Sequence, residues 1–324
     1  MQTRRLGAFG DVSRLVLGGG GIGQVWGATS GEEAKATLWA AVDAGITLID
    51  AAPMYGSCEA LIGETFEGRP PAGLRFTSKC QLGSPPRGAA AARLAASAEA
   101  SLAAMRLPRL DLFFLHSNIC ADDYVYARRA EMQDQFATRW SIYVDEVIPA
   151  MEGLVQAGKI GAWGLTGTGV PETIIRALNH ARKPAAVQAI ANLLDSAGGI
   201  RSYAEPARPR DIIAAAADAD VGVLGIRAVQ AGALTDAIDR ELSPRHPDRL
   251  DYERASPFRA LCAELGVKPA MLAHRYALAM PGVDAVVLGV KNRAELDDCL
   301  AAEAEALDPA VAARIDALGL REPA

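Results

Sequence analysis

The length, composition and charge of the chain favour a large folded domain and exclude several classes of protein. Half of its 324 residues are hydrophobic and 22% are charged, which suits a sizeable core and argues against extensive disorder. The formal net charge of −6 argues against binding to nucleic acid or to an anionic membrane surface.

The N-terminal stretch and the cysteines bear on cellular location. The stretch MQTRRLGAFGDV lacks the apolar core of a signal peptide, and no later run approaches the roughly 18 apolar residues of a membrane-spanning helix. The five cysteines are scattered, with no CxxC and no histidine at metal-ligand spacing. We expect a cytoplasmic protein with free thiols and no metal site.

In chain order, short apolar or β-branched runs alternate with longer Ala-rich stretches of helical character. The predicted strands are Leu15-Leu17, Ile46-Asp50, Leu74-Ser78, Leu110-Leu115, Gly161-Leu165, Ala185-Ile190, Val221-Ile226 and Ala285-Leu288. The predicted helices are Glu32-Asp43, Glu59-Phe66, Ala89-Met105, Val144-Ala157, Glu172-Ala181, Arg210-Ala217, Pro257-Leu265 and Pro269-Met280. This alternation is typical of a parallel (β/α)8 TIM barrel, an α/β fold, and we expect residues 1–324 to form one such domain.

A barrel of this type takes about 250 residues, so the surplus must lie in additions. Phe9-Gly10-Asp11 is predicted to be the turn of an N-terminal β-hairpin that closes the barrel bottom. A long polar and aromatic insertion, residues 117–143, follows the fourth strand, and a tail follows Leu300. Residues 127–139 lack Gly and Pro and predict a helix. We interpret the insertion as a lid over the barrel or as an element of its rim.

Polar residues end three successive predicted strands. Asp50 ends the second strand, with Tyr55 in the turn just beyond it. Lys79 follows the third strand and His116 the fourth. Each of these residues alone is more often structural or simply exposed to solvent. In a barrel, however, these strand ends converge on the C-terminal face, where active sites of this fold are built, so their shared position favours a catalytic site.

These four side chains suit carbonyl reduction or its reverse, alcohol oxidation. A lysine ammonium beside Tyr55 is expected to lower the pKa of the phenol, and Asp50 would hold Lys79 charged and oriented. His116 could hydrogen-bond a substrate carbonyl while Tyr55 donates the proton as hydride arrives at carbon. This is general-acid catalysis.

Longer motifs run in order over nearly the whole chain: GITLIDAAPMYG, EALIGETF, FTSK, DLFFLH, GKIGAWGLTG, VQAIANLL, VGVLGIRAVQAGALT and VVLGVKNRAELDDCL. In these stretches the chain is similar to the aldo-keto reductase superfamily. The resemblance implies a catalytic tetrad of Asp50, Tyr55, Lys79 and His116. It also implies an extended NADP(H), with NAD(H) as the alternative, across the barrel mouth, and a small carbonyl or alcohol substrate.

The same resemblance suggests contacts with the nicotinamide. Thr166 and Gln188 would lie near its carboxamide, and Asn192 would line the same pocket. Many family members carry an aromatic residue that stacks on the nicotinamide where this chain has Ile226, and a small polar residue where it has Arg227. We expect both positions to contact the cofactor, with altered affinity and orientation.

At the adenosine end of the cofactor the residues themselves agree with the resemblance. Asn292 can cap a helix with Glu295 three positions on, which leaves N–H groups exposed to an anion. Lys291 and Arg293 flank that helix start and suit the 2'-phosphate of NADP.

Two other interpretations remain. The stretch from Gly18 to Gly23 satisfies GxGxxG and formally suggests a Rossmann dehydrogenase, but that fold gives no reason for Lys79 and His116 to end the next strands. In a barrel, these glycines, Gly21 among them, would let the backbone approach the cofactor. The second alternative is a cofactor-binding barrel with a redox-sensing or regulatory role and little turnover. The sequence leaves the oligomeric state open.

Overall fold

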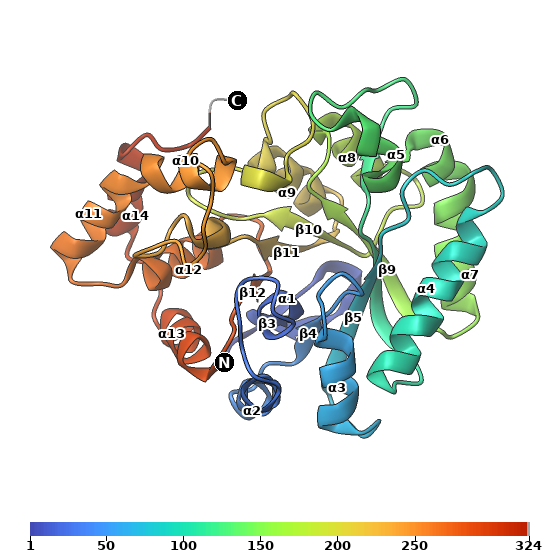
Figure 1. Ribbon diagram of the computed structural model, residues 1–324, viewed down its shortest axis with the longest axis horizontal. Coiled ribbons are helices and arrows are strands. Elements are labelled where there is room, and N and C mark those ends of the chain that lie inside the picture. Colours follow the sequence, from blue (N-terminus) through green and yellow to red (C-terminus); the bar gives the residue numbers. More distant parts are fainter. Residues whose placement is uncertain (323–324) are drawn as a thin grey trace.

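The computed structural model describes residues 1–322, and its centre is a closed barrel of parallel strands (Figure 1). The strands are β3 (Leu15–Gly18), β4 (Leu48–Asp50), β5 (Arg75–Cys80), β6 (Leu110–Leu115), β9 (Ile160–Gly167), β10 (Ala186–Ile190), β11 (Gly222–Ile226) and β12 (Ala285–Leu288). They neighbour one another in chain order, and β12 pairs with β3 to close the barrel. The predicted TIM barrel is confirmed, and each predicted strand overlaps an observed one.

Helices surround the barrel and cover its outer face (Figure 1). They are α2 (Gly31–Asp43), α3 (Cys58–Phe66), α4 (Ala90–Met105), α7 (Ile148–Gln156), α8 (Pro171–Leu178), α9 (Pro209–Asp218), α12 (Pro269–Ala279) and α13 (Arg293–Ala304). Other helical segments are α1 (Gly19–Ile22), the π-helical turn η3 (Tyr143–Val147), η4 (Gly198–Ile200), η5 (Gln230–Gly232), α10 (Pro247–Arg254), α11 (Ser256–Leu265) and α14 (Pro309–Ala317). No helix within residues 1–322 is long and apolar enough to cross a membrane.

A hairpin closes the bottom of the barrel, as the sequence predicts, but its turn begins earlier than predicted, because Asp11 already belongs to the second strand. Strands β1 (Thr3–Arg5) and β2 (Asp11–Ser13) pair in antiparallel fashion around a 3-10 turn, η1 (Gly7–Phe9). Leu6 is fully buried and belongs to the cluster that fills the lower barrel: Leu6, Val12, Val16, Leu48, Leu112, Phe114, Ala186, Leu224 and Ala285. The hairpin therefore supplies part of the apolar packing at the bottom of the barrel interior.

Above this apolar layer, the barrel interior becomes polar. Successive side chains of a strand alternate between its two faces, so residues two positions apart point the same way. Asp50 follows Leu48 in this inward series, and Gln188 follows Ala186. The inward-facing residues are therefore apolar in the lower barrel and polar at the C-terminal ends of the strands.

The insertion after β6 differs from its prediction. It contains a two-stranded parallel sheet of β7 (Asn118–Cys120) and β8 (Ala137–Arg139), with short helical segments η2 (Ala130–Met132), α5 (Gln133–Phe136) and α6 (Trp140–Ile142). The helix predicted over residues 127–139 is present only in part, since η2 and α5 cover residues 130–136 and the two ends of the span are not helical. Arg129 has a positive φ of 54°, and the chain becomes extended at Ala137 to pair with β7. Tertiary pairing overrides helix propensity here.

Hydrogen bonds attach this insertion to the loops at the C-terminal end of the barrel. Thr138 Oγ1 donates to the carbonyl of Gly83 at 2.7 Å, and Thr168 Oγ1 donates to Asn118 Oδ1 at 3.0 Å. A small apolar cluster joins it to the loops after β9 and β10: Cys120, Tyr126, Ala137, Val170 and Tyr203. The insertion therefore lies on the rim of the face that holds the polar layer.

Candidate active site

A buried ion pair between Asp50 and Lys79 is the centre of the site. Lys79 Nζ donates to Asp50 Oδ2 at 2.6 Å and to the carbonyl of Ala51 at 2.9 Å. The other carboxylate oxygen, Asp50 Oδ1, accepts from Thr77 Oγ1 at 2.6 Å and from Gln188 Nε2 at 2.7 Å. Both carboxylate oxygens are thus engaged, which fixes the position of the lysine ammonium.

Tyr55 and His116 lie directly against this pair. The Lys79 ammonium is 4.6 Å from the centre of the Tyr55 ring. The rings of Tyr55 and His116 meet edge to face, with centroids 5.8 Å apart. The backbone N–H of His116 donates to the carbonyl of Cys80 at 2.8 Å, so pairing between the β5 and β6 segments continues to this residue. The structure therefore brings all four predicted tetrad residues together.

The pKa of Tyr55 corrects one sequence-based expectation. Burial raises the pKa of the phenol and outweighs the opposing effect of Lys79, so the pKa lies above its usual value instead of below it. For Lys79, burial alone would lower the pKa, but Asp50 and Tyr55 more than offset it and the pKa is raised. At neutral pH the site therefore holds a protonated phenol beside a charged ammonium.

His116 is neutral at physiological pH. Burial, followed by the charge of Lys79, lowers the pKa of its imidazole to about 3. Its Nδ1 is buried and has no hydrogen-bond partner among the described residues. A neutral imidazole has one N–H donor and one acceptor nitrogen, so the ring can donate a hydrogen bond without carrying charge.

Thr166 and Gln188, the predicted carboxamide contacts, lie side by side on paired strands β9 and β10. Thr166 Oγ1 is buried with no hydrogen-bond partner within residues 1–322, and it is thus a polar atom available to a ligand. Gln188 donates its amide to Asp50 instead. Asn192 donates from Nδ2 to the carbonyls of Ser196 and Arg227, and so braces the loop after β10.

Ile226 and Arg227 end β11, and the structure gives the arginine partners that the sequence did not indicate. Ile226 is half-buried. Arg227 has a positive φ of 59°, and its guanidinium forms an ion pair with Asp248 at 2.7 Å and donates to Gln230 Oε1 at 2.8 Å. These contacts hold the Arg227 side chain among buried polar groups.

The glycines after β3 permit close backbone packing. At Gly21 a side chain would collide with the carbonyl of Val290 in the loop after β12. The loops that follow the first and last barrel strands therefore meet backbone to backbone at this point. Since these strands belong to a closed barrel, the Rossmann interpretation of the GxGxxG pattern is wrong.

The start of α13 carries the predicted cap and two cations that are already paired. Asn292 Oδ1 accepts from the backbone N–H of Glu295 at 2.9 Å, as predicted. Lys291 Nζ forms ion pairs with Asp239 at 2.7 Å and with Glu295 at 3.0 Å. An incoming phosphate would therefore have to replace a carboxylate partner of Lys291.

The second cation, Arg293, is paired with Glu33 of α2 at 2.9 Å. Glu33 lies in the first turn of α2, where its backbone N–H donates to Ser30 Oγ at 3.1 Å. Its carboxylate, however, also accepts from the backbone N–H of Arg293 at 3.0 Å. Since 260 positions separate the two residues, no local signal could reveal this pair.

These features fit a dinucleotide cofactor. Near the tetrad, Thr166 and His116 have buried polar atoms without hydrogen-bond partners within residues 1–322, and these atoms could bind the nicotinamide end of the cofactor or the substrate. The capped start of α13, with its two cations, could bind a phosphate at the adenosine end. The cysteines, all buried and free, take no part in the tetrad.

Comparison with known proteins identifies relatives of the whole chain. The model of the Aldo/keto reductase family matches residues 14–319. L-galactose dehydrogenase of Arabidopsis thaliana is 25% identical over 310 residues, which cover 94% of this chain and 89% of the plant protein. Methylglyoxal reductase YeaE of Escherichia coli K12 is 31% identical over 172 residues, about half of each chain.

Solved structures share the fold at low identity. The holo form of aldo-keto reductase AKR11C1 from Bacillus halodurans superposes with a TM-score of 0.72 at 20% identity, over 98% of this chain and 96% of that one. Glycerol dehydrogenase AKR11B4 from Gluconobacter oxydans gives 0.70 at 21% identity, over 98% and 94%. Because the family model spans nearly the whole chain and the barrel matches, this protein belongs to the aldo/keto reductase family of oxidoreductases.

Proposed function

We propose that this protein interconverts aldehydes or ketones and alcohols by NAD(P)H-dependent hydride transfer, with Tyr55 as general acid and base. The observation that carries the proposal is a protonated Tyr55 phenol in contact with a charged, buried Lys79 and a neutral His116. Such a trio can polarise a carbonyl and supply its proton in one place.

Each side chain has a separate task in the proposed mechanism. His116 donates a hydrogen bond to the carbonyl oxygen, and Tyr55 delivers its phenolic proton to that oxygen. Lys79 stabilises the phenolate that Tyr55 leaves behind. Asp50 keeps Lys79 charged and oriented. A bound nicotinamide cofactor would supply the hydride, and the same residues would serve alcohol oxidation in reverse.

The cofactor proposal extends to particular contacts. Thr166 Oγ1, which lacks a partner within residues 1–322, supports a role in holding the nicotinamide carboxamide. We infer that Gln188, Ile226, Arg227 and Gly21 border the cofactor from the ends of the neighbouring strands. We further propose a preference for NADP(H), with Lys291, Asn292, Arg293 and Glu295 around the 2'-phosphate.

The substrate class is a small carbonyl compound or alcohol. The relatives are named for L-galactose, methylglyoxal and glycerol, all small polar molecules. We therefore expect turnover with short polyhydroxylated or oxidised aldehydes before bulky aromatic ones.

A substrate panel tests the proposal. Purified protein is assayed by absorbance at the nicotinamide band with glyceraldehyde, methylglyoxal, 4-nitrobenzaldehyde, glycerol and free aldoses, each with the NADP and the NAD couple. We expect measurable turnover with several of these, and its loss in Tyr55→Phe. Tight cofactor binding without turnover of any compound would reject the enzyme and leave the regulatory alternative.

A further inference from the structure

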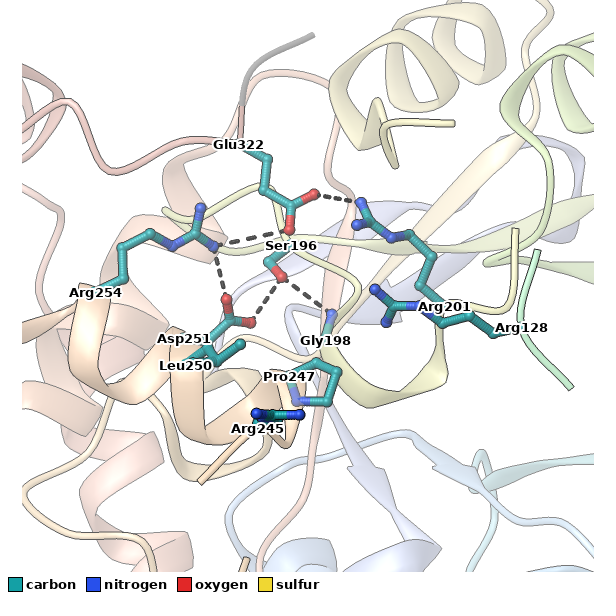
Figure 2. A pocket seen from close by; sticks show the side chains of 10 residues that line it. All are labelled: Arg128, Ser196, Gly198, Arg201, Arg245, Pro247, Leu250, Asp251, Arg254 and Glu322. Carbon is teal, nitrogen blue, oxygen red and sulfur yellow. Dashed lines mark hydrogen bonds and ion pairs between the residues drawn. The ribbon is translucent and has the colours of Figure 1, made fainter. Parts of the chain in front are cut away.

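A cavity of about 280 Å³ lies apart from the tetrad (Figure 2). It is bordered by the insertion after β6, the loop after β10, the segment that leads into α10, and the C-terminal Glu322. Apart from Glu322, these parts follow the carboxyl ends of barrel strands. The cavity therefore belongs to the same face of the barrel as the catalytic residues, but it contains none of them.

The lining of this cavity is rich in arginine. Arg128, Arg201, Arg245 and Arg254 line it, against the two carboxylates of Asp251 and Glu322. The chain as a whole has a net charge of −6, so a local excess of positive charge runs against its overall balance. In Figure 2, Arg254 approaches from one side, and Arg201 and Arg128 approach from the other.

The two acidic residues that line the cavity, Asp251 and Glu322, already have hydrogen-bond or ion-pair partners. Asp251 is buried, accepts from Arg254 at 2.8 Å and accepts from Ser196 Oγ at 2.7 Å. Glu322 lies between Arg201, at 2.9 Å, and Arg254, at 4.0 Å. A carboxylate of the chain thus already bridges two of the arginines, so this geometry accommodates an oxyanion.

The other two arginines lack such partners. Arg128 and Arg245 are exposed lining residues, and within residues 1–322 neither forms an ion pair with a carboxylate. Pro247 and Leu250, the latter 51% exposed, add apolar surface beside them. Unneutralised guanidinium groups beside a cavity attract anions, and phosphate and carboxylate groups match their donor geometry.

We propose that this cavity binds a compact oxyanion, the phosphate or carboxylate group of a small organic molecule. Arg128 and Arg245 supply the free charges, and Arg201 and Arg254 complete the cradle. The bound group is either the anionic end of a carbonyl substrate or part of a separate ligand. Both sources share the same recognition chemistry, and the experiment separates them.

The binding test uses inorganic phosphate and the full-length protein. Calorimetric titrations at constant ionic strength compare the wild type with Arg128→Ala/Arg245→Ala. The control is Arg249→Ala, because Arg249 lies on α10, which follows Arg245, pairs with Glu253 and does not line the cavity. We expect saturable binding in the wild type and the control, and binding at least about tenfold weaker in the double variant, because two charge-assisted contacts are lost.

Two results would overturn the proposal. The first is phosphate binding that does not saturate in the wild type or is equal in the double variant. The second is a parallel loss of NADP+ affinity in the double variant, which would make the cavity part of the cofactor site. Neither measurement needs turnover, so the proposal stands or falls separately from the catalytic assignment.

A pair of matched aldehydes identifies the source of the oxyanion. 4-Carboxybenzaldehyde and 4-nitrobenzaldehyde differ in charge at the position opposite the carbonyl. A raised KM for the carboxylate alone in the double variant supports the cavity as the anchor of an anionic substrate. Unchanged KM values for both, together with lost phosphate binding, support it as the site of a separate anionic ligand.

Discussion

The Asp50–Lys79 ion pair and the ion pairs at the start of α13 use the same kinds of charged group in opposite surroundings. Lys79 and Asp50 are 0% and 2% exposed, whereas Arg293 and Glu33 are 57% and 27% exposed. A buried pair that loses one partner leaves an uncompensated charge, but an exposed pair can exchange a partner for water or a ligand at little cost. Burial thus separates a pair whose partners are fixed from pairs whose partners can be exchanged.

The largest expected effect is at Tyr55. Tyr55→Phe should lower kcat by roughly 10²–10⁴-fold, since the general acid is removed, while cofactor affinity stays nearly unchanged. Steady-state rates and fluorescence titration with NADPH check both parts. Tyr143→Phe is the matched control, because the Tyr143 hydroxyl is also buried but has no hydrogen-bond partner within residues 1–322. If Tyr55→Phe kept more than a tenth of the rate of a chemistry-limited step, Tyr55 would not be the acid.

A stability comparison tests the contrast between buried and exposed pairs directly. Lys79→Met leaves Asp50 charged and buried, and should lower the free energy of unfolding by about 3–5 kcal/mol. Lys268→Met breaks a pair with Asp298 whose side chains are 60% and 37% exposed, and should cost about 0–1 kcal/mol. Urea denaturation measures both. Equal losses would show that burial does not distinguish the two pairs.

Cofactor choice tests whether the exposed pairs yield to phosphate. NADPH should bind at least about tenfold more tightly than NADH, and Lys291→Ala should remove most of that preference. Glu33→Gln should act in the opposite direction: it frees Arg293, so NADPH binds several-fold more tightly while NADH is unaffected. Fluorescence titrations give all these constants. Equal affinities of the wild type for the two cofactors would refute the 2'-phosphate assignment.

The depressed pKa of His116 predicts how stability and activity depend on pH. The unfolded chain binds a proton on this histidine below about pH 6.5, but the folded protein does so only near pH 3. The stabilising contribution is therefore present above about pH 6.5 and is lost as the pH falls toward 3, by at most about 1.4 kcal/mol per pH unit.

Denaturation of wild type and His116→Gln between pH 4 and 8 measures this contribution. The variant should show the shallower loss of stability on acidification. Carbonyl reduction should show no decline between pH 8 and 5 that titrates with a group of pKa near 6.5. Such a decline would mean that His116 carries an ordinary pKa.

The smallest expected effect concerns the insertion, residues 117–143, which we propose sets substrate choice. Replacing residues 122–131 with a Gly-Ser linker of equal length leaves β7, β8 and α5 in place. The replacement should raise KM and change the ranking of aldehydes a few-fold, provided that NADPH affinity is retained. An unchanged ranking would assign the insertion a structural role on the rim.

The barrel and its tetrad could be predicted from sequence because both depend on local patterns. Most of the strands are apolar or β-branched runs, and Asp50, Lys79 and His116 each stand at or near the end of a strand. The inward direction of a residue follows from the two-residue period of a strand. Once a barrel is predicted, these patterns are enough to predict that the four tetrad residues lie together.

Long-range partners could not be predicted in this way. The acids paired with Arg227 and Arg293, namely Asp248 and Glu33, come from other loops and helices. The predicted helix of the insertion was too long for a related reason, since residues 137–139 pair as β8 with β7, a contact that no local signal reveals. The Tyr55 pKa was misjudged because a sequence reveals a neighbouring lysine but not the depth of burial.

The N-terminal hairpin covers the end of the barrel opposite the polar layer. Leu6 is fully buried, and its apolar cluster lies beneath the polar layer that contains Lys79. The apolar side chains below the Lys79 ammonium have a low dielectric constant. They therefore screen the charge of Lys79 less than water would. Deleting residues 1–8 would remove Leu6 from the apolar cluster beneath the polar layer and is expected to loosen its packing without touching any residue of the mouth. Extensions at Met1, which is exposed, would leave this apolar layer intact.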